Sequence, residues 1–240
     1  MKSMSRNIEL TPGELYHLYN RGTEKRRIFT RGRDYDRFLA LLYLSNSTKP
    51  FHINDLARGR TSGELEELFV LDRGEPLADL CAYCLMPNHF HLLVREKTKS
   101  GVSRFMQKLI TGFTMYFNTR YERTGVLFQG KYKATYVDDD RYLKYLLSYI
   151  HLNPVKLIEP KWKETGIANR PRAEKFLENY QYSSWLDYSG KNRIERHILN
   201  MNALEEYYEY KAPNDFKESV TDWLGYQSPS VEPEVRPRGS

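Results

Sequence analysis

Hydrophobic and polar residues alternate with two different periods along the first 160 residues of the chain. Runs that alternate from side to side predict β-strands, and apolar residues spaced three or four apart predict amphipathic helices. We expect strands at residues 15–20, 78–86, 89–94 and 131–137. We expect helices from about Asp34, over residues 103–121, and from about Arg141 to Asn153-Pro154, because a residue before proline avoids the helical region.

The resulting order is strand, helix, strand, strand, helix, strand, with a further helix after the last strand. This order predicts an α+β, ferredoxin-like (RRM-like) fold, in which an antiparallel sheet has helices on one face. The predicted core covers residues 1–160 and contains an insertion at about 50–77 that fits no simple element. Residues 161–227 form a C-terminal, mostly helical extension, with helices expected over 194–210 and 215–224. Residues 228–240 are rich in Pro, Ser, Glu and Arg and are expected to be disordered.

The strand at residues 89–94 carries two histidines separated by one phenylalanine. Because side chains alternate across a strand, His89 and His91 share one face and Phe90 points to the other. Apolar residues follow on both faces, which predicts a central strand covered on both sides. Two imidazoles at a fixed separation are a pair of metal ligands, although two histidines satisfied by hydrogen bonds in a sheet would have the same pattern.

The net charge of +6 and the 19 tyrosines favour a polyanionic partner whose unpaired bases stack on aromatic rings. A basic run after the first strand, with Arg21, Lys25, Arg26 and Arg27, reads as a solvated loop or as one that follows a phosphate backbone. With two cysteines, no apolar run long enough for a membrane and no apolar signal segment, we expect a reduced, cytoplasmic protein. The absence of a phosphate-binding Gly-x-x-x-x-Gly-Lys motif argues against an ATP-driven motor.

The last helix of the predicted core places Tyr149 and Asn153 four residues apart, on one face. A phenol can attack phosphorus beside a metal, and an amide oxygen can be a third, neutral ligand. Packing and a helix stop would also explain these two residues. His151 is expected to point away from this face. Cys81 and Cys84, three apart on one strand, are expected to face opposite sides, which argues against a zinc site shared with the histidines.

Three stretches carry a resemblance to a known family. They are Tyr16-His17-Leu18-Tyr19-Asn20-Arg21-Gly22, Ala82-Tyr83-Cys84-Leu85-Met86-Pro87-Asn88-His89-Phe90-His91-Leu92-Leu93-Val94 and Tyr149-Ile150-His151-Leu152-Asn153-Pro154-Val155-Lys156. Over residues 16–188 the sequence resembles the HUH single-tyrosine transposases of small bacterial insertion sequences, and most of all their domesticated branch, the REP-associated tyrosine transposases. The insertion at 50–77 and the segment after Tyr188 depart from the family pattern.

The resemblance implies a single-stranded DNA endonuclease and strand transferase that acts beside DNA hairpins through a covalent 5′-phosphotyrosine. It implies that Tyr149 is the nucleophile and that His89, His91 and Asn153 hold Mg²⁺ or Mn²⁺. DNA is expected to bind at Arg21, Lys25, Arg26, Arg27, Lys131 and Lys133. The implied location is the bacterial cytoplasm beside the nucleoid, and a homodimer fits, since the family includes dimers. Two alternatives stay open: a DNA-binding protein that has kept only the scaffold, and a metal-dependent hydrolase that uses water.

Overall fold

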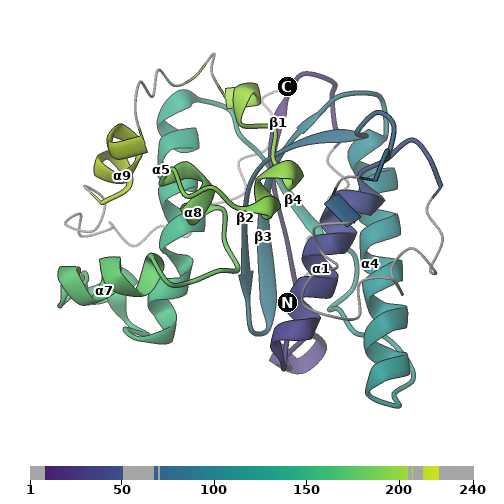
Figure 1. Cartoon of the computed structure of the whole chain (residues 1–240), viewed down its shortest axis with the longest axis horizontal. Helices are drawn as coiled ribbons and strands as arrows, with labels where there is room; N and C mark the ends of the chain where they lie inside the picture. Colours follow the sequence, from purple (N-terminus) through teal and green to yellow (C-terminus); the bar gives the residue numbers. More distant parts are fainter. Residues whose placement is uncertain (1–8, 51–67, 70, 205–206, 208–212, 222–240) are drawn as a thin grey trace.

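Four strands form a single antiparallel sheet in the computed structural model, which describes residues 9–50, 68–69, 71–204, 207 and 213–221 (Figure 1). They are β1 (Leu15–Arg21), β2 (Ala78–Met86), β3 (His89–Glu96) and β4 (Lys133–Tyr136). The order across the sheet is β2-β3-β1-β4, and each neighbouring pair is antiparallel. The predicted α+β, ferredoxin-like fold is confirmed, and β3 is central as expected.

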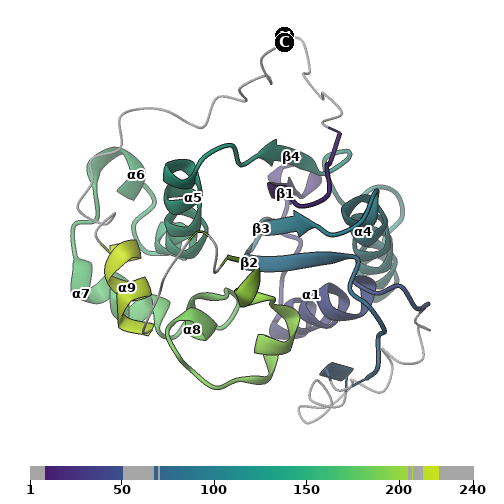
Figure 2. The same ribbon diagram turned by 90° about the horizontal axis from the view of Figure 1, so that it is seen from above.

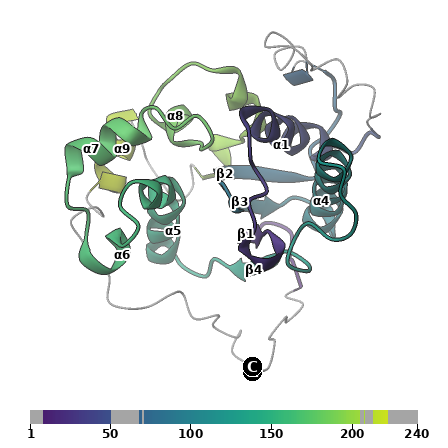
Figure 3. The same ribbon diagram turned by 90° about the horizontal axis from the view of Figure 1, so that it is seen from below.

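Helices cover both faces of the sheet, as Figures 2 and 3 show, so the prediction of helices on one face only is wrong. The helices α1 (Gly32–Ser45) and α4 (Gly101–Arg120) lie on one face. The helix α5 (Asp140–Leu152) packs its apolar residues on the second face, together with the segment that follows it. A short 3-10 turn, η1 (Thr23–Lys25), lies in the loop between β1 and α1.

The alternation along β3 explains this arrangement, because the strand supplies apolar side chains to two separate cores. Phe90, Leu92 and Val94 pack with residues of α1 and α4. Leu93 packs with residues of α5 on the opposite face, which is also the face of His91. The predicted division of β3 into a phenylalanine face and a histidine face is therefore confirmed.

One prediction about β2 is wrong. The pairing of β2 with β3 shifts register between Leu80 and Ala82, so that Cys81 is an extra residue in a β-bulge. The bulge interrupts the alternation, and both Cys81 and Cys84 are buried in the core on the α5 face rather than on opposite faces. Burial raises the pKa of both thiols above the ordinary value.

The chain enters α5 as the sequence indicates, but Asn153 keeps helical dihedral angles (φ −53°, ψ −39°), so the expectation that the residue before Pro154 avoids the helical region is wrong. The Asp139 carboxylate caps the helix by accepting a hydrogen bond of 2.6 Å from the backbone N–H of Tyr142. The α-helix ends at Leu152, and the chain continues directly into the 3-10 turn η2 (Asn153–Leu157), which contains Pro154. His151 points away from β3, as expected, because its Nε2 lies 2.8 Å from Ser184 Oγ in the C-terminal segment.

The C-terminal segment is mostly made of short elements: α6 (Trp162–Thr165), α7 (Arg170–Leu177), α8 (Trp185–Tyr188), η3 (Ile194–Ile198), η4 (Met201–Leu204) and α9 (Pro213–Thr221). It covers the outer edge of β2, where Leu85 N donates to Tyr182 O at 2.9 Å and Ser184 N to Tyr83 O at 3.0 Å. The expected helix at 215–224 is α9 as far as residue 221.

A single helix over residues 194–210 is wrong over its described part, where η3 and η4 stand instead. The chain is extended at Leu199, and Asn200 reaches β2, where its backbone N–H donates to Leu80 O at 2.8 Å. This backbone contact with the sheet interrupts the helix that the spacing of apolar residues predicts. Most of the insertion and the tail at 228–240 lie outside the described residues, so those predictions stay open. No helix in the described part of the chain has the length and apolar content needed to cross a membrane.

Candidate functional site

The β2–β3 hairpin places the two predicted histidines at one edge of the core. Pro87 and Asn88 form its tight turn, and His89 and His91 follow on one face of β3. Their ring centroids are 5.0 Å apart and the ring planes are perpendicular. The side chain of His91 is almost fully buried, and the Nδ1 of His89 lies 2.6 Å from Asn88 Oδ1.

A third histidine, His17 on β1, belongs to the same cluster. Its Nε2 lies 2.9 Å from His91 Nδ1, and the two rings stack with centroids 5.1 Å apart. His17 lies in the motif at residues 16–22, and the sequence alone indicates no role for it. The sequence shows that His17 and Tyr19 share a face of β1. Only the strand register, which pairs Tyr19 with His91 and His17 with Leu93, shows that His17 lies diagonally across from His91.

The helix α5 brings the predicted nucleophile to these histidines. The Tyr149 ring meets the His91 ring edge-on at a centroid distance of 5.3 Å, and it lies 6.1 Å from the His17 ring. Asn153 is fully buried one turn further along, and its amide lies against His89. The structure therefore brings Tyr149, His89, His91 and Asn153 together from the two elements that the sequence analysis named.

Burial keeps the three imidazoles uncharged at neutral pH. It lowers the pKa of His17 to about 3, with a smaller contribution from Lys163. It lowers the pKa of His89 to about 4, helped by the charge of Lys156 and opposed by the amide of Asn153. The pKa of His91 is also well below its ordinary value, through burial and then the nearby His17. A neutral imidazole has a free lone pair, which is the form that binds a metal.

Two buried polar atoms of this cluster have no hydrogen-bond partner in the described part of the chain: His91 Nε2 and Asn153 Oδ1. Buried polar atoms nearly always have a hydrogen-bond partner, so two atoms without one in the same cluster indicate that something else binds there. Both atoms are of the kind that ligates divalent cations, and contact with His17 through Nδ1 orients the other nitrogen of His91. His89, His91 and Asn153 therefore fit a metal. Among the described residues, no three His, Cys, Asp or Glu side chains are placed to hold a metal ion together, so the proposed site needs the amide of Asn153 as its third ligand.

The basic loop wraps around the turn that carries the histidines. Gly22 N donates to Asn88 O at 2.8 Å, and Asn88 Nδ2 donates to the backbone oxygen of Lys25 at 3.2 Å. Arg21, Lys25 and Arg27 are exposed, whereas Arg26 is half-buried and pairs with Glu24 at 3.1 Å. Gly22 is required by close approach, since a Cβ there would lie 2.4 Å from the backbone oxygen of Arg26.

The remaining predicted DNA-binding residues lie on the other side of β1. Lys131 and Lys133 are exposed, and the Nζ of Lys133 is 5.9 Å from the Tyr19 ring centroid. In the sheet register Lys133 lies opposite Tyr19, which in turn lies opposite His91. The predicted basic residues thus lie on both sides of the histidine cluster.

A lysine of the C-terminal segment also reaches the cluster. The Nζ of Lys163, on α6, lies 3.7 Å from the centroid of the Tyr149 ring. The sequence analysis did not identify this residue, because no local pattern connects a short helix after Pro160 to the face of Tyr149.

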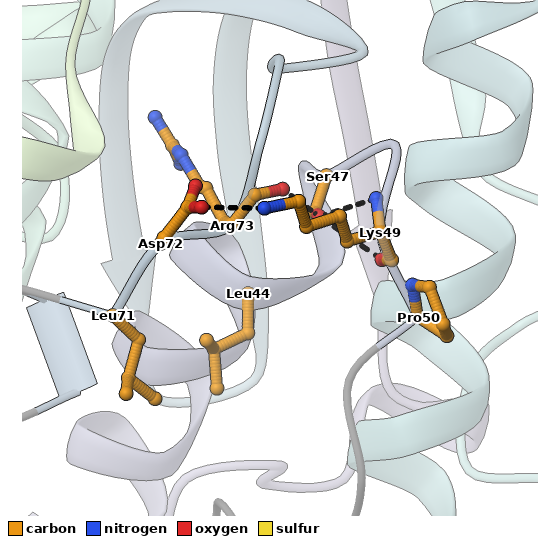
Figure 4. Close-up of a pocket in the computed structure, with 7 residues that line it drawn as sticks. All are labelled: Leu44, Ser47, Lys49, Pro50, Leu71, Asp72 and Arg73. Carbon is orange, nitrogen blue, oxygen red and sulfur yellow. Dashed lines mark hydrogen bonds and ion pairs between the residues drawn. The ribbon is translucent and has the colours of Figure 1, made fainter.

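A small hollow of about 150 Å³ lies at the C-terminal end of α1 (Figure 4). Ser47, Lys49, Asp72 and Arg73 line it, and Lys49 pairs with Asp72. Asn46, which precedes Ser47, donates a hydrogen bond from its side chain to the backbone oxygen of Ala78, the first residue of β2. His89 and His91 follow the opposite end of β2. The hollow is therefore separate from the histidine cluster.

Part of the chain is similar to a known protein family. Residues 57–153 match the family described as "Transposase IS200 like". A comparison with curated proteins gives no match. A solved structure described as "Structure of the REP associates tyrosine transposase bound to a REP hairpin" is similar, with 12% identity and a TM-score of 0.49, over 81% of this chain and 90% of that one. The matched residues contain both the His-x-His strand and the helix that carries Tyr149.

Proposed function

We propose that the protein is a metal-dependent endonuclease and strand transferase that cuts single-stranded DNA and forms a covalent 5′-phosphotyrosine through Tyr149. The observation that carries the proposal is the packing of the Tyr149 ring against His91, next to the two orphaned atoms, His91 Nε2 and Asn153 Oδ1.

His89, His91 and Asn153 are the residues that would hold Mg²⁺ or Mn²⁺. When bound, such an ion polarises the scissile phosphate and offsets its negative charge. The protein itself provides the nucleophile and fixes its position: α5 is capped by Asp139 at its start and packed on the sheet, which holds Tyr149 on the histidine face. Positioning of this kind removes much of the entropic barrier to attack.

The reaction exchanges one phosphodiester for another. The Tyr149 oxygen forms a bond to phosphorus while the bond from phosphorus to the 3′ oxygen breaks. The phenol releases its proton and the 3′ oxygen takes one up, so the products are a 5′-phosphotyrosine and a free 3′ hydroxyl. No bond energy is lost in the exchange, so the hydroxyl can attack back and rejoin strands without ATP.

The substrate we propose is single-stranded DNA next to a hairpin. The support is the basic loop, which is fixed by hydrogen bonds to the turn between β2 and β3 and exposes Arg21, Lys25 and Arg27 beside the site. Contacts to phosphates give an affinity that falls as salt rises. We propose that the protein acts in the cytoplasm at the nucleoid, as a monomer or homodimer.

The test is the substitution Tyr149→Phe, which keeps the ring and its packing but removes the attacking oxygen. Hairpin-bearing single-stranded oligonucleotides, labelled at either end, are incubated with Mn²⁺ and resolved under denaturing conditions. We expect the wild-type protein to form an adduct that carries the 3′-end label, and Tyr149→Phe to form none while binding DNA normally.

Tyr145→Phe is the matched control, since its ring stacks on Tyr149 at 6.1 Å one turn earlier and it should stay active. An adduct that survives in Tyr149→Phe would give the role to another tyrosine. Cleavage by the wild type without any adduct would favour the water-using hydrolase, and DNA binding without cleavage would favour a scaffold that has kept only its binding function.

A further inference from the structure

The side chain of Lys163 places a cation directly on the ring of Tyr149. Its Nζ lies 3.7 Å from the ring centroid, well inside the range of a cation–π contact. The lysine is half-buried, so its charge is less screened than that of a surface lysine. The same charge contributes to lowering the pKa of His17, His89 and His91, which means that it acts on the whole cluster.

The position of Lys163 is built into the fold rather than left to a free loop. The helix α6 lies beside α5 in Figures 2 and 3. Its first residue, Trp162, packs against the core on the α5 face, and its backbone N–H donates to Glu159 O at 3.1 Å. The Glu159 carboxylate accepts hydrogen bonds from Ala168 N at 2.8 Å and Asn169 N at 3.2 Å, which closes the loop that contains α6.

We infer that Lys163 binds the scissile phosphate of the DNA and neutralises the charge that develops on it as Tyr149 attacks. This inference rests on the proposed function. It gives a direct part in the reaction to Lys163, which lies outside residues 57–153 that match the family. A phosphate at the Tyr149 oxygen lies beside the ring that the ammonium already contacts, and the flexible lysine stem can carry the ammonium from the ring face to that phosphate. A cation at this place stabilises the charge that develops in the transition state more than it stabilises the bound substrate.

The chemistry needs no co-reactant beyond those of the proposed transfer. One bond from phosphorus to the tyrosine oxygen forms and one to the 3′ oxygen breaks, and the lysine keeps its proton throughout. Its contribution is electrostatic, so arginine should replace it in part, whereas an uncharged side chain of similar length should not.

The experiment compares Lys163→Met and Lys163→Arg with Lys161→Ala, using the full chain and the labelled hairpin oligonucleotide. Methionine keeps an apolar stem over the ring but removes the charge. Lys161 is an exposed lysine two residues earlier, so its loss changes net charge equally. At saturating DNA we expect the rate of adduct formation to fall on the order of 100-fold in Lys163→Met, to recover partly in Lys163→Arg and to stay near wild type in Lys161→Ala.

A second readout does not depend on cleavage. Loss of one phosphate contact should reduce the slope of log affinity against log salt by about 0.7 in Lys163→Met, measured without metal. A wild-type rate in Lys163→Met would overturn the inference, and so would weaker binding with an unchanged rate at saturation. If the wild type forms no adduct, the proposed function fails, and an unchanged salt slope would then show separately that Lys163 touches no phosphate.

Discussion

Replacing Asp34 with asparagine removes a buried charge while keeping the shape of the side chain. Asp34 lies in the first turn of α1 and is fully buried. Its Oδ2 accepts from Thr30 N and Thr30 Oγ, both at 2.8 Å, from Arg31 N at 3.0 Å and from the Tyr121 hydroxyl at 2.8 Å. Its Oδ1 accepts from the Tyr116 hydroxyl at 2.9 Å. The carboxylate thus ties the end of the basic loop to α1 and α4.

The geometry sets the magnitude of the expected loss. An asparagine with its oxygen at the Oδ2 position keeps all four donors there, and the Tyr116 hydroxyl can turn to accept from the new amide. What is lost is the extra strength of hydrogen bonds to a charged acceptor, which are roughly twice as strong as neutral ones. We expect Asp34→Asn to lower the free energy of unfolding by about 2 kcal/mol. We expect Asp34→Ala, which removes the acceptor of the Thr30 and Arg31 backbone N–H groups, to lower it by about 4 kcal/mol.

The effect should depend on pH with a definite sign. Burial alone would raise the pKa of Asp34, but hydrogen bonds from Thr30, Tyr121 and Arg31 together hold it below its ordinary value. The unfolded chain therefore takes up this proton first as the pH falls. The stabilisation by ionised Asp34 is fully present above the unfolded pKa of about 3.9 and is lost as the pH falls through the folded pKa.

The assay is urea denaturation of the wild type and of Asp34→Asn at several pH values between 7 and 3. The difference in unfolding free energy should be constant near neutral pH and shrink below about pH 4. Asp36 is the matched control on the same helix. Burial, and after it the negative charge of Glu195, raises the pKa of Asp36, so its ionised form is disfavoured in the folded protein. Asp36→Asn should therefore not destabilise the protein at pH 7. Equal stability of Asp34→Asn and wild type at pH 7, or a difference that grows in acid, would refute the reasoning.

Two further predictions concern the site. His89→Ala and His91→Ala should abolish cleavage with Mn²⁺. Asn153→Ala should weaken cleavage less, because an amide binds most transition metals less strongly than an imidazole does. Normal cleavage by both histidine variants in a gel assay would contradict the assignment of the metal ligands. Charge reversal at Lys25 and Arg27 should weaken binding to a hairpin oligonucleotide in a titration at low salt, whereas reversal at Arg26, which already pairs with Glu24, should have a smaller effect; equal losses would show that the pair does not matter.

Local periodicity predicted most of the fold. The strand β2 begins and ends where the sequence indicates, at Ala78 and Met86, and α1 and α4 begin within two residues of the predicted positions. These elements have strong alternation or helical spacing, and turn residues bound them. The side chains of Tyr149, His89, His91 and Asn153 lie together because α5 packs on the histidine face of β3. Their roles in binding a metal and attacking DNA stay predictions.

Local periodicity could not predict contacts that depend on register or on tertiary packing. The contact between the ring nitrogens of His17 and His91 depends on which residue of β1 lies opposite which residue of β3, and the sequence does not give this register. The bulge at Cys81 adds one residue to β2 without leaving a proline or glycine to mark it. Lys163 reaches Tyr149 only because the chain turns back after Pro160 and packs on α5.

The histidine face of the sheet explains why the C-terminal segment and the core depend on each other. On that face the bulge turns Cys81 inward beside Cys84 and Met86, so β2 presents an apolar surface that water would otherwise contact. Residues 182–184 pair with the outer edge of β2, and Trp185 and Tyr188 pack over this surface, where the Tyr188 hydroxyl donates to Cys81 O at 2.8 Å. The same segment places Lys163 on the nucleophile. The predicted boundary near residue 160 marks a change in sequence character, but the buried surface of β2 and the ring of Tyr149 are each in contact with residues from beyond it.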